Sequence, residues 1–143
     1  MNPSFLAVSR HFLLLAMISC GCGEKNTVFT PVRGRVFYKD QPLTRGTIVF
    51  TPDSERGGRG DLATAEIQPD GSYYLKTKDH LGVIPGWHRV TIIALEAMNN
   101  QGRAETFIEP RSLLPDKYRD PDLSGLCFEV LPEQINVKDF HLE

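Results

Sequence analysis

From residue 31 onward the chain is made of short runs in which apolar and polar residues alternate, and Gly, Pro or Asp separates one run from the next. Alternation with a period of two is typical of strands with one buried face, whereas an amphipathic helix needs apolar residues three and four positions apart. β-branched and aromatic residues are frequent within the runs, which also favours strands. This pattern limits the fold more than any other feature of the sequence, and it predicts an all-β, antiparallel β-sandwich.

Seven of these runs are long enough to form strands. They span residues 32–38, 46–51, 62–67, 72–77, 87–95, 126–131 and 135–142. The longest run, 87–95, is largely apolar on both faces, so we expect it in the middle of a sheet. Within it, Val90, Ile92 and Ala94 should share one face. Residues 113–119 contain a proline and can hold one helical turn.

Length and composition bound the number of domains and the class of partner. Of the 143 residues, 41% are hydrophobic and 24% are charged, which is typical of a chain that folds into one globular domain. The formal net charge is −2, and the basic residues are scattered along the chain. A nucleic-acid-binding surface needs clustered Lys and Arg, so the sequence argues against that class of partner.

The first 19 residues have the features of a secretory signal peptide. They contain one Lys or Arg residue, Arg10, no acidic residue, an apolar run over residues 12–18, and the small Ser19. The run is much shorter than the ~20 apolar residues needed to span a bilayer. We therefore expect residues 1–19 to be removed during export, which places the mature protein outside the cytoplasm.

The cysteine that follows this segment resembles the modified cysteine of the bacterial lipobox, which a small residue precedes. Cys20, directly after Ser19, is accordingly the expected site of lipid attachment. Cys22 is the alternative, because a glycine precedes it, and a plain signal peptide with incidental cysteines also fits the sequence. Residues 20–29 would then form a flexible tether and residues 30–143 the β-sandwich domain of a membrane-anchored lipoprotein of the cell envelope.

The sequence contains no pattern typical of a metal, cofactor or catalytic site. Cys20 and Cys22 form a Cys-x-Cys pair, which can suggest metal binding, but no second Cys or His pair stands at a ligand-like distance. His80, His88 and His141 are far apart in the sequence. Residues 53–61 contain three glycines and two arginines, but a phosphate-binding loop leads into a helix, whereas this loop leads into an expected strand. Cys127 lies within an expected strand and is predicted to be a buried, unreactive thiol. We therefore expect no catalytic residue, no cofactor and no metal ion.

The runs and the turns between them contain short motifs in a definite order. These are VRGRV at 32–36, QPL at 41–43, GTIVFTP at 46–52, DGSY at 70–73, PGWHRV at 85–90, PDKY at 115–118 and SGL at 124–126. Together they resemble the short lipoproteins of planctomycete bacteria that carry a carboxypeptidase-regulatory-like, transthyretin-like domain, and the resemblance covers nearly the whole chain. It implies a Greek-key sandwich of about seven strands that acts as a folding, docking or adhesion module. The related hydroxyisourate hydrolases end in Tyr-Arg-Gly-Ser, whereas this chain ends in Phe-His-Leu-Glu, so their catalytic residues are not transferred.

The sequence thus predicts a noncatalytic envelope module with a docking or structural role, whose partner is an unknown envelope protein or polysaccharide. A carbohydrate-binding module is the alternative, with Tyr73, Tyr74 and Trp87 as candidate stacking rings. Alternation places Tyr73 and Tyr74 on opposite faces of the sheet, so only one of them can belong to such a surface. A small hydrolase is a third possibility, in which a histidine would act with a serine, but no nucleophile motif frames these residues.

Replacing Cys20 by Ala should abolish acylation and release the protein from membranes, because buried acyl chains are what hold a tethered protein at a bilayer. Cys22→Ala should leave acylation and membrane attachment unchanged. Mass spectrometry of the mature N-terminus, together with membrane fractionation, measures both outcomes. A lipid found on Cys22 would move the anchor to that residue, and an unmodified N-terminus would contradict the lipoprotein assignment.

Overall fold

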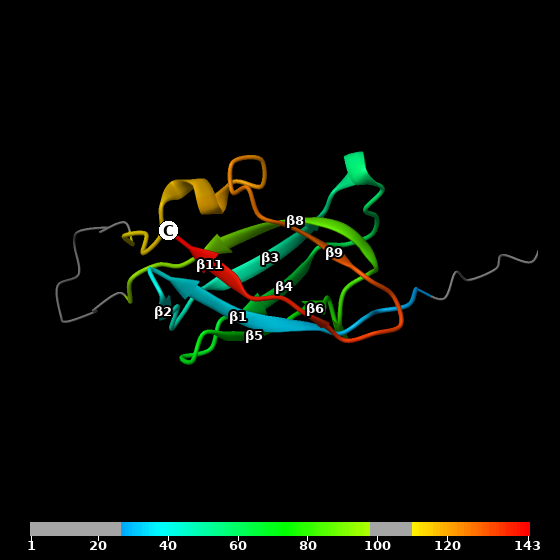
Figure 1. Ribbon diagram of the computed structural model, residues 1–143, viewed down its shortest axis with the longest axis horizontal. Coiled ribbons are helices and arrows are strands. Elements are labelled where there is room, and N and C mark those ends of the chain that lie inside the picture. The colour runs from blue at the N-terminus through cyan, green and yellow to red at the C-terminus, as the bar shows by residue number, and fades with distance from the viewer. Residues whose placement is uncertain (1–26, 98–109) are drawn as a thin grey trace, which may run out of the picture.

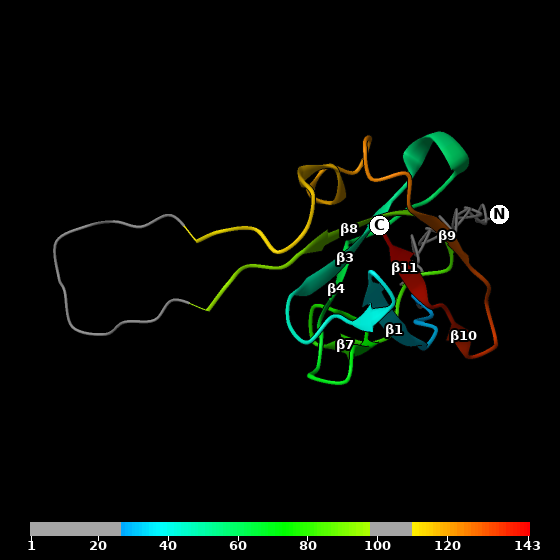
Figure 2. The same cartoon turned by 60° about the vertical axis from the view of Figure 1, so that its left-hand side comes forward.

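The structure is a computed structural model that describes residues 27–97 and 110–143. The predicted signal peptide, both candidate lipid sites (Cys20 and Cys22) and most of the predicted tether lie outside the described residues. Within the described ranges the chain is all-β, with eleven short strands in two sheets and two short 3-10 helices. The arrangement of the two sheets is consistent with the predicted β-sandwich (Figures 1 and 2). No helix within these two ranges is long and apolar enough to cross a bilayer.

The first sheet is built around β1 (Val32–Tyr38), which pairs with other strands along both of its edges. Its neighbours are β5 (Ser72–Tyr74) and β2 (Gln41–Pro42) on one edge, and β10 (Asn136–Val137) and β11 (Phe140–Leu142) on the other. The apolar residues at alternate positions of β1, Val32 and Val36, are buried, as the alternation predicts.

The pairing of β1 with β10 and β11 is parallel, so the expectation of an antiparallel sandwich is wrong at this edge. After the second sheet, the chain returns to the end of the sandwich where β1 begins, and the Asn136 N–H donates to the Pro31 carbonyl (2.9 Å). From there the last strands run alongside β1 in the same direction (Figure 1). The period of a strand pattern shows which residues share a face, but it does not show the direction of the neighbouring strand.

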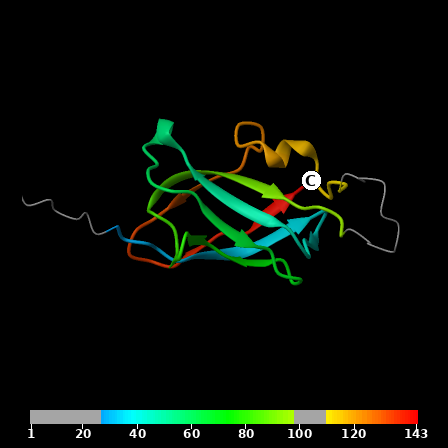
Figure 3. The ribbon, with the colours of Figure 1, turned by 180° about the vertical axis from the view of Figure 1, so that it is seen from behind.

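The second sheet has six strands, each antiparallel to its neighbours (Figure 3). In spatial order they are β7 (His80–Leu81), β6 (Lys76–Thr77), β4 (Ala63–Glu66), β3 (Thr47–Pro52), β8 (Gly86–Ile93) and β9 (Cys127–Val130). The longest, β8, lies between β3 and β9, which confirms the prediction for the run 87–95. Val90, Ile92 and Ala94 are all buried, whereas Ile93 is 38% exposed, so the predicted faces of this run are confirmed too.

Two runs that the pattern predicts as single strands are each divided in two. Residues 72–77 form β5 in the first sheet and β6 in the second, because the chain crosses between the sheets at Leu75, whose N–H donates to the Val32 carbonyl (3.0 Å). Residues 135–142 form β10 and β11, with Lys138 and Asp139 between them. These two divisions, together with β2 and β7, which lie outside the predicted runs, give eleven strands in the described part of the chain instead of the predicted seven.

A cluster of aromatic rings joins the two sheets inside the core. Phe50 of β3 contacts Phe128 of β9 and Phe140 of β11, with centroid distances of 6.3 and 6.1 Å and interplanar angles of 71° and 80°. The ring of Tyr73, on β5, lies 6.3 Å from that of Phe140. Such edge-to-face contacts contribute ~0.5–1.5 kcal/mol each beyond simple burial. Because Phe50 and Phe140 belong to different sheets, this cluster holds the sheets face to face.

The described part of the segment between β8 and β9 closes one side of the sandwich. The Leu113 N–H donates to the Ala94 carbonyl (2.9 Å), which continues the edge of β8. The 3-10 helix η2 (Asp116–Arg119) follows and confirms the predicted helical turn. Its Tyr118 is buried, and the Tyr118 hydroxyl accepts a hydrogen bond from the Glu143 N–H (3.0 Å). The segment thereby ties the edge of the second sheet to the end of β11.

Gly34, in the middle of β1, lies where a second backbone segment passes closely. A Cβ at this position would overlap the carbonyl oxygen of Lys138 and would lie 3.1 Å from the Tyr73 hydroxyl. The Tyr73 hydroxyl donates to the same carbonyl (2.7 Å), and burial raises the pKa of Tyr73, so the donor stays protonated. The site is therefore filled without any side chain on residue 34.

Gly34→Ala should lower the free energy of unfolding by about 2 kcal/mol or more, because an added methyl group at a filled site displaces its neighbours. Urea denaturation of the full chain measures the change. Arg45→Ala, at an exposed position outside the strands, should alter the free energy of unfolding by less than about 0.5 kcal/mol. Equal losses in the two variants would contradict the close approach at Gly34.

Candidate functional site

One outward surface of the first sheet gathers side chains suited to binding. Arg33, Arg35 and Phe37 alternate with the buried residues of β1 and so point away from the core. Flanking strands add further side chains on the same side. We call this surface the β1 face; it consists of Arg33, Arg35, Phe37, Ser72, Tyr74, Val137, Asp139 and His141.

Tyr74 and Val137 flank Arg33, since both pair with it across the sheet. They are 60% and 61% exposed, so a large aromatic ring and an aliphatic side chain face solvent together. Nη1 of Arg33 donates to the Tyr74 hydroxyl (2.8 Å), and the guanidinium carbon lies 5.9 Å from the ring centroid. Tyr73 is fully buried, which confirms that the two adjacent tyrosines lie on opposite faces.

Arg35 is the second cation of the β1 face. Its backbone N–H donates to Oδ1 of Asp139 (2.8 Å), whereas its guanidinium group makes no ion pair or hydrogen bond within the described residues. Hydrogen bonds from Ser72 hold the pKa of Asp70 below its usual value, and the positive charge of Arg35 acts in the same direction. The guanidinium of Arg35 thus interacts with Asp70 through charge, without an ion pair or hydrogen bond that fixes its position.

The cations and the tyrosine ring line one shallow cleft of about 360 Å³. Its lining consists of Arg33, Gly34, Arg35, Ser72, Tyr73, Tyr74, Val137 and Asp139. The charged residues of this lining are two arginines and one aspartate, and Asp70 lies close enough to Arg35 for their charges to interact. Beyond it, the rings of Phe37 and His141 stack at 4.8 Å with an interplanar angle of 8° and extend the face along β1.

A second cluster of charged side chains lies on the outer side of the second sheet, and its members form ion pairs with one another. Asp53 is only 4% exposed, and its Oδ2 lies 3.3 Å from Nε of Arg89 and 3.6 Å from Nε of Arg56. Arg89 also pairs with Glu55 and Asp122. The hydrogen bond and charge of Asp53 raise the pKa of Arg89. This cluster neutralises a buried carboxylate, so its role is structural.

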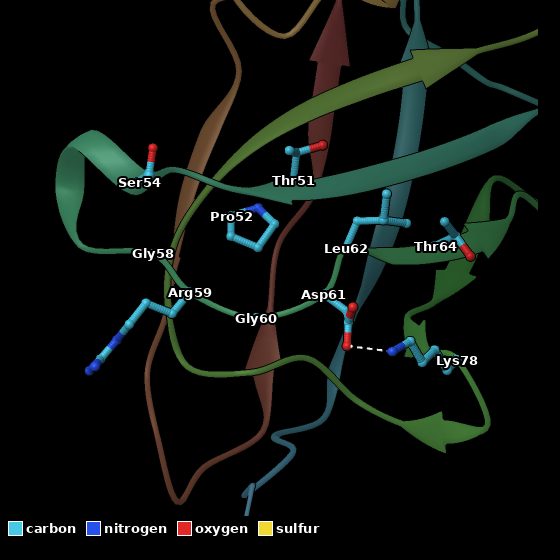
Figure 4. Close-up of a pocket in the computed structure, with 10 residues that line it drawn as sticks. All are labelled: Thr51, Pro52, Ser54, Gly58, Arg59, Gly60, Asp61, Leu62, Thr64 and Lys78. Atoms are coloured by element: carbon cyan, nitrogen blue, oxygen red, sulfur yellow. Dashed lines mark ion pairs between the residues drawn. The ribbon is translucent and has the colours of Figure 1, made fainter.

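The glycine-rich loop of residues 53–61 borders a pocket of about 690 Å³ (Figure 4). As predicted, the loop leads into a strand, β4. Figure 4 shows Arg59 pointing away from Asp61 and Lys78, which form an ion pair with each other (2.8 Å). The guanidinium of Arg56 lies 5.0 Å from the centroid of the Trp87 ring instead of facing the pocket. The cations of this loop thus do not converge on one point, as an anion cradle would require.

Trp87 is the third ring that the sequence offers as a stacking platform. It is half-buried, and the Arg56 guanidinium lies over it. Of the three candidate rings, Tyr74 is therefore the one that faces solvent most openly.

The three histidines of the described residues occupy separate surroundings. His80 stacks on Phe29 (4.6 Å), His141 stacks on Phe37, and His88 is buried beside Phe50. No group of three or more His, Cys, Asp or Glu side chains within residues 27–97 and 110–143 is placed to hold a metal ion.

The serines that a hydrolase would need are engaged in local contacts. The Ser72 hydroxyl donates to Asp70 (2.6 Å) and the Ser112 hydroxyl to the Leu114 carbonyl (2.7 Å), while the Ser124 hydroxyl accepts from a backbone N–H. None of these hydroxyls is hydrogen-bonded to a histidine within the described residues. The described part of the chain therefore pairs none of these serines with a histidine base.

The prediction that Cys127 is buried is wrong, because its side chain is exposed. Cys127 of β9 lies opposite Arg89 of β8 in the strand register, on the outer side of the sheet. Its Sγ lies 3.6 Å from Nη1 of Arg56. The alternation contained a usable signal, since Glu129 is two residues away and must share a face with Cys127. The alternation in β1 also indicated that Arg33 and Arg35 share an outward face. It did not show that Tyr74 pairs with Arg33 on the same face.

Comparisons with known proteins give no relative: no family model, no curated protein and no solved structure matches this chain.

His88 is a titratable group with an unfavourable environment for charge. Its side chain is fully buried, and burial holds its pKa below 6.5, although a hydrogen bond to the Gly86 carbonyl (2.9 Å) opposes this shift. Nε2 has no hydrogen-bond partner in the described residues. In the unfolded chain the same imidazole binds a proton near its ordinary pKa of about 6.5. Acidification below that value therefore favours the unfolded state.

The wild-type protein should lose stability as the pH falls from about 7 to about 5, with a slope that approaches ~1.4 kcal/mol per pH unit for this one group. His88→Asn removes the titration but keeps a donor near the Gly86 carbonyl, so this part of the slope should disappear. His80→Asn, at an exposed position, should retain it. Urea denaturation at several pH values measures the slopes, and an unchanged slope in His88→Asn would refute the assignment.

Proposed function

We propose that this protein is a noncatalytic binding module, held at the cell envelope by an N-terminal lipid, and that the β1 face is its binding surface. One observation carries the proposal. Two guanidinium groups and an exposed tyrosine ring lie together in one cleft, and neither guanidinium forms an ion pair with a carboxylate of the described residues. The other cluster of arginines, around Asp53, is satisfied internally.

The noncatalytic part of the proposal rests on the separate environments of the histidines and serines. General base catalysis needs a base within hydrogen-bond reach of the group that it deprotonates. Here each histidine ring packs against a different aromatic side chain, on a different strand or at its flank. Binding residues, in contrast, are gathered on one surface.

We further propose that the sandwich has the Greek-key topology of transthyretin-like, carboxypeptidase-regulatory-like domains, and that the chain is a lipoprotein of the planctomycete type. The support is the order of the sequence motifs, together with the two-sheet, all-β architecture. Fold alone does not define activity, so the function rests on the side chains of the β1 face. The partner is an envelope protein or a polysaccharide.

The attachment of the domain to its tether supports access to this surface. Thr30 pairs with Val83 immediately before β1, so the domain begins at the end of the sandwich where β1 starts. The strand β1 runs from there along the sandwich toward the end of β11 (Figure 1). A lipid anchor would thus leave the β1 face at the side of the domain, open to material of the envelope.

A combined Arg33→Gln, Tyr74→Ala variant of the lipid-anchored protein should retain at least about tenfold less material from solubilised envelopes than the wild type. A few residues of a binding surface carry most of its binding energy, and these two are the proposed ones. Affinity capture, followed by quantification of both protein and saccharide, measures retention. Arg59→Gln, which removes an exposed cation outside the β1 face, is the matched control and should retain as much as the wild type. Equal retention by all three proteins would show that the β1 face is not the binding surface.

A further inference from the structure

The central position of β1 limits how the β1 face can recognise a ligand. Arg33 pairs with both Tyr74 and Val137, and Phe37 pairs with both Pro42 and His141, so both edges of β1 are occupied. A peptide that binds by adding a strand needs a free edge. A ligand on this face must therefore be recognised by side chains alone.

The tyrosine of the face is arranged as a stacking platform. Tyr74 is 60% exposed, and its hydroxyl is held by Arg33, which fixes one edge of the ring. An exposed ring with few rotatable bonds offers a large apolar area at little cost in conformational entropy. A sugar ring fits such a surface, because it has an apolar face of C–H groups and a periphery of hydroxyl groups.

The polar groups around Tyr74 match the remaining chemistry of a sugar acid. Arg33 and Arg35 point to the same side of β1, about 7 Å apart along the strand. A guanidinium group binds a carboxylate through two parallel hydrogen bonds, and neither arginine is hydrogen-bonded or ion-paired to a carboxylate through its guanidinium in the described residues. Asp139 uses Oδ1 for the Arg35 N–H, which leaves Oδ2 to accept from a sugar hydroxyl.

We infer that the β1 face binds an acidic polysaccharide, with one sugar ring stacked on Tyr74 and a sugar carboxylate held by Arg35. This inference rests on the proposed binding function and adds the chemical class of the ligand. From Arg33 to Phe37 the face extends about 13 Å along β1, and the Phe37–His141 ring pair lies at its far end. It therefore accommodates a short stretch of a polymer.

Calorimetric titration of the full chain, purified in detergent, tests the inference with three polymers: polygalacturonate, neutral dextran and polyglutamate. We expect polygalacturonate to bind, and to bind less tightly as NaCl is raised from about 50 to about 500 mM, because salt screens the arginine–carboxylate attraction. Dextran and polyglutamate should bind at least about tenfold more weakly, since each lacks one half of the recognised chemistry.

Four single variants assign the recognition to residues. Tyr74→Ala and Arg35→Gln should each weaken polygalacturonate binding at least about tenfold, a loss typical of anchoring residues. Tyr74→Phe keeps the ring and should stay within about threefold of the wild type, and Arg59→Gln should bind like the wild type. All three positions are exposed, and an unchanged urea midpoint for each of the four variants confirms that the fold is intact.

Three results would overturn the inference. If dextran bound as tightly as polygalacturonate, the sugar carboxylate would not contribute to binding. If polyglutamate bound as tightly, the ligand of the β1 face would be an acidic protein instead. Absence of binding to all three polymers would exclude the acidic polysaccharide. In each case the proposed binding function stands if retention of envelope material still depends on Arg33 and Tyr74, and falls if it does not.

Discussion

The parallel pairing of the first strand with the last strands is the constraint on which the rest of this structure depends. It joins residues 104 positions apart, such as Arg35 and Asp139. By occupying the second edge of β1, it makes that strand central, buries Val36 beside Phe140, and sets Arg33 in the middle of a broad sheet face. Contacts between such distant residues form only after a long loop has closed. The β1 face therefore exists only in the completed fold.

The local features of the fold could be predicted from the sequence because short-range periodicity determines them. The alternation in residues 87–95 separates Val90 and Ile92 from Ile93, and the same reasoning separates Tyr73 from Tyr74. The helical turn at residues 116–119 follows from its local sequence as well. For the candidate site, the sequence identified Tyr74 as one of three possible stacking rings, but it did not show which ring is exposed.

The features that escaped prediction depend on contacts between distant strands. The crossing of the chain between sheets at Leu75 changes no local pattern, since Leu75 is a normal inward residue of one continuous alternation. The pairing of Arg33 with Tyr74 joins residues 41 positions apart, and the parallel course of β10 and β11 depends on where the preceding segment turns back. Cys127 is a different case, because its exposure was available from the charge of Glu129 two positions away.

Arginines on the two outer surfaces of the sandwich differ in their contacts. Arg89 is part of an ion-pair cluster, whereas Arg35 forms no ion pair within the described residues. Arg89 and Arg56 together neutralise the buried Asp53, so removal of Arg89 would leave this carboxylate with only the longer contact to Arg56, which is unfavourable in the protein interior. Arg35 satisfies no buried group through its guanidinium in the described residues, so the fold does not need its charge.

The two arginines of the β1 face also differ in how much ordering a ligand must impose on them. A free arginine side chain carries about 2 kcal/mol of rotamer entropy, which is lost when a ligand immobilises it. Arg33 is already ordered by its hydrogen bond to Tyr74, whereas Arg35 is not held. Under the proposed binding function, a ligand would first engage the preorganised Tyr74–Arg33 end, and Arg35 would then adapt to the position of the ligand's negative charge.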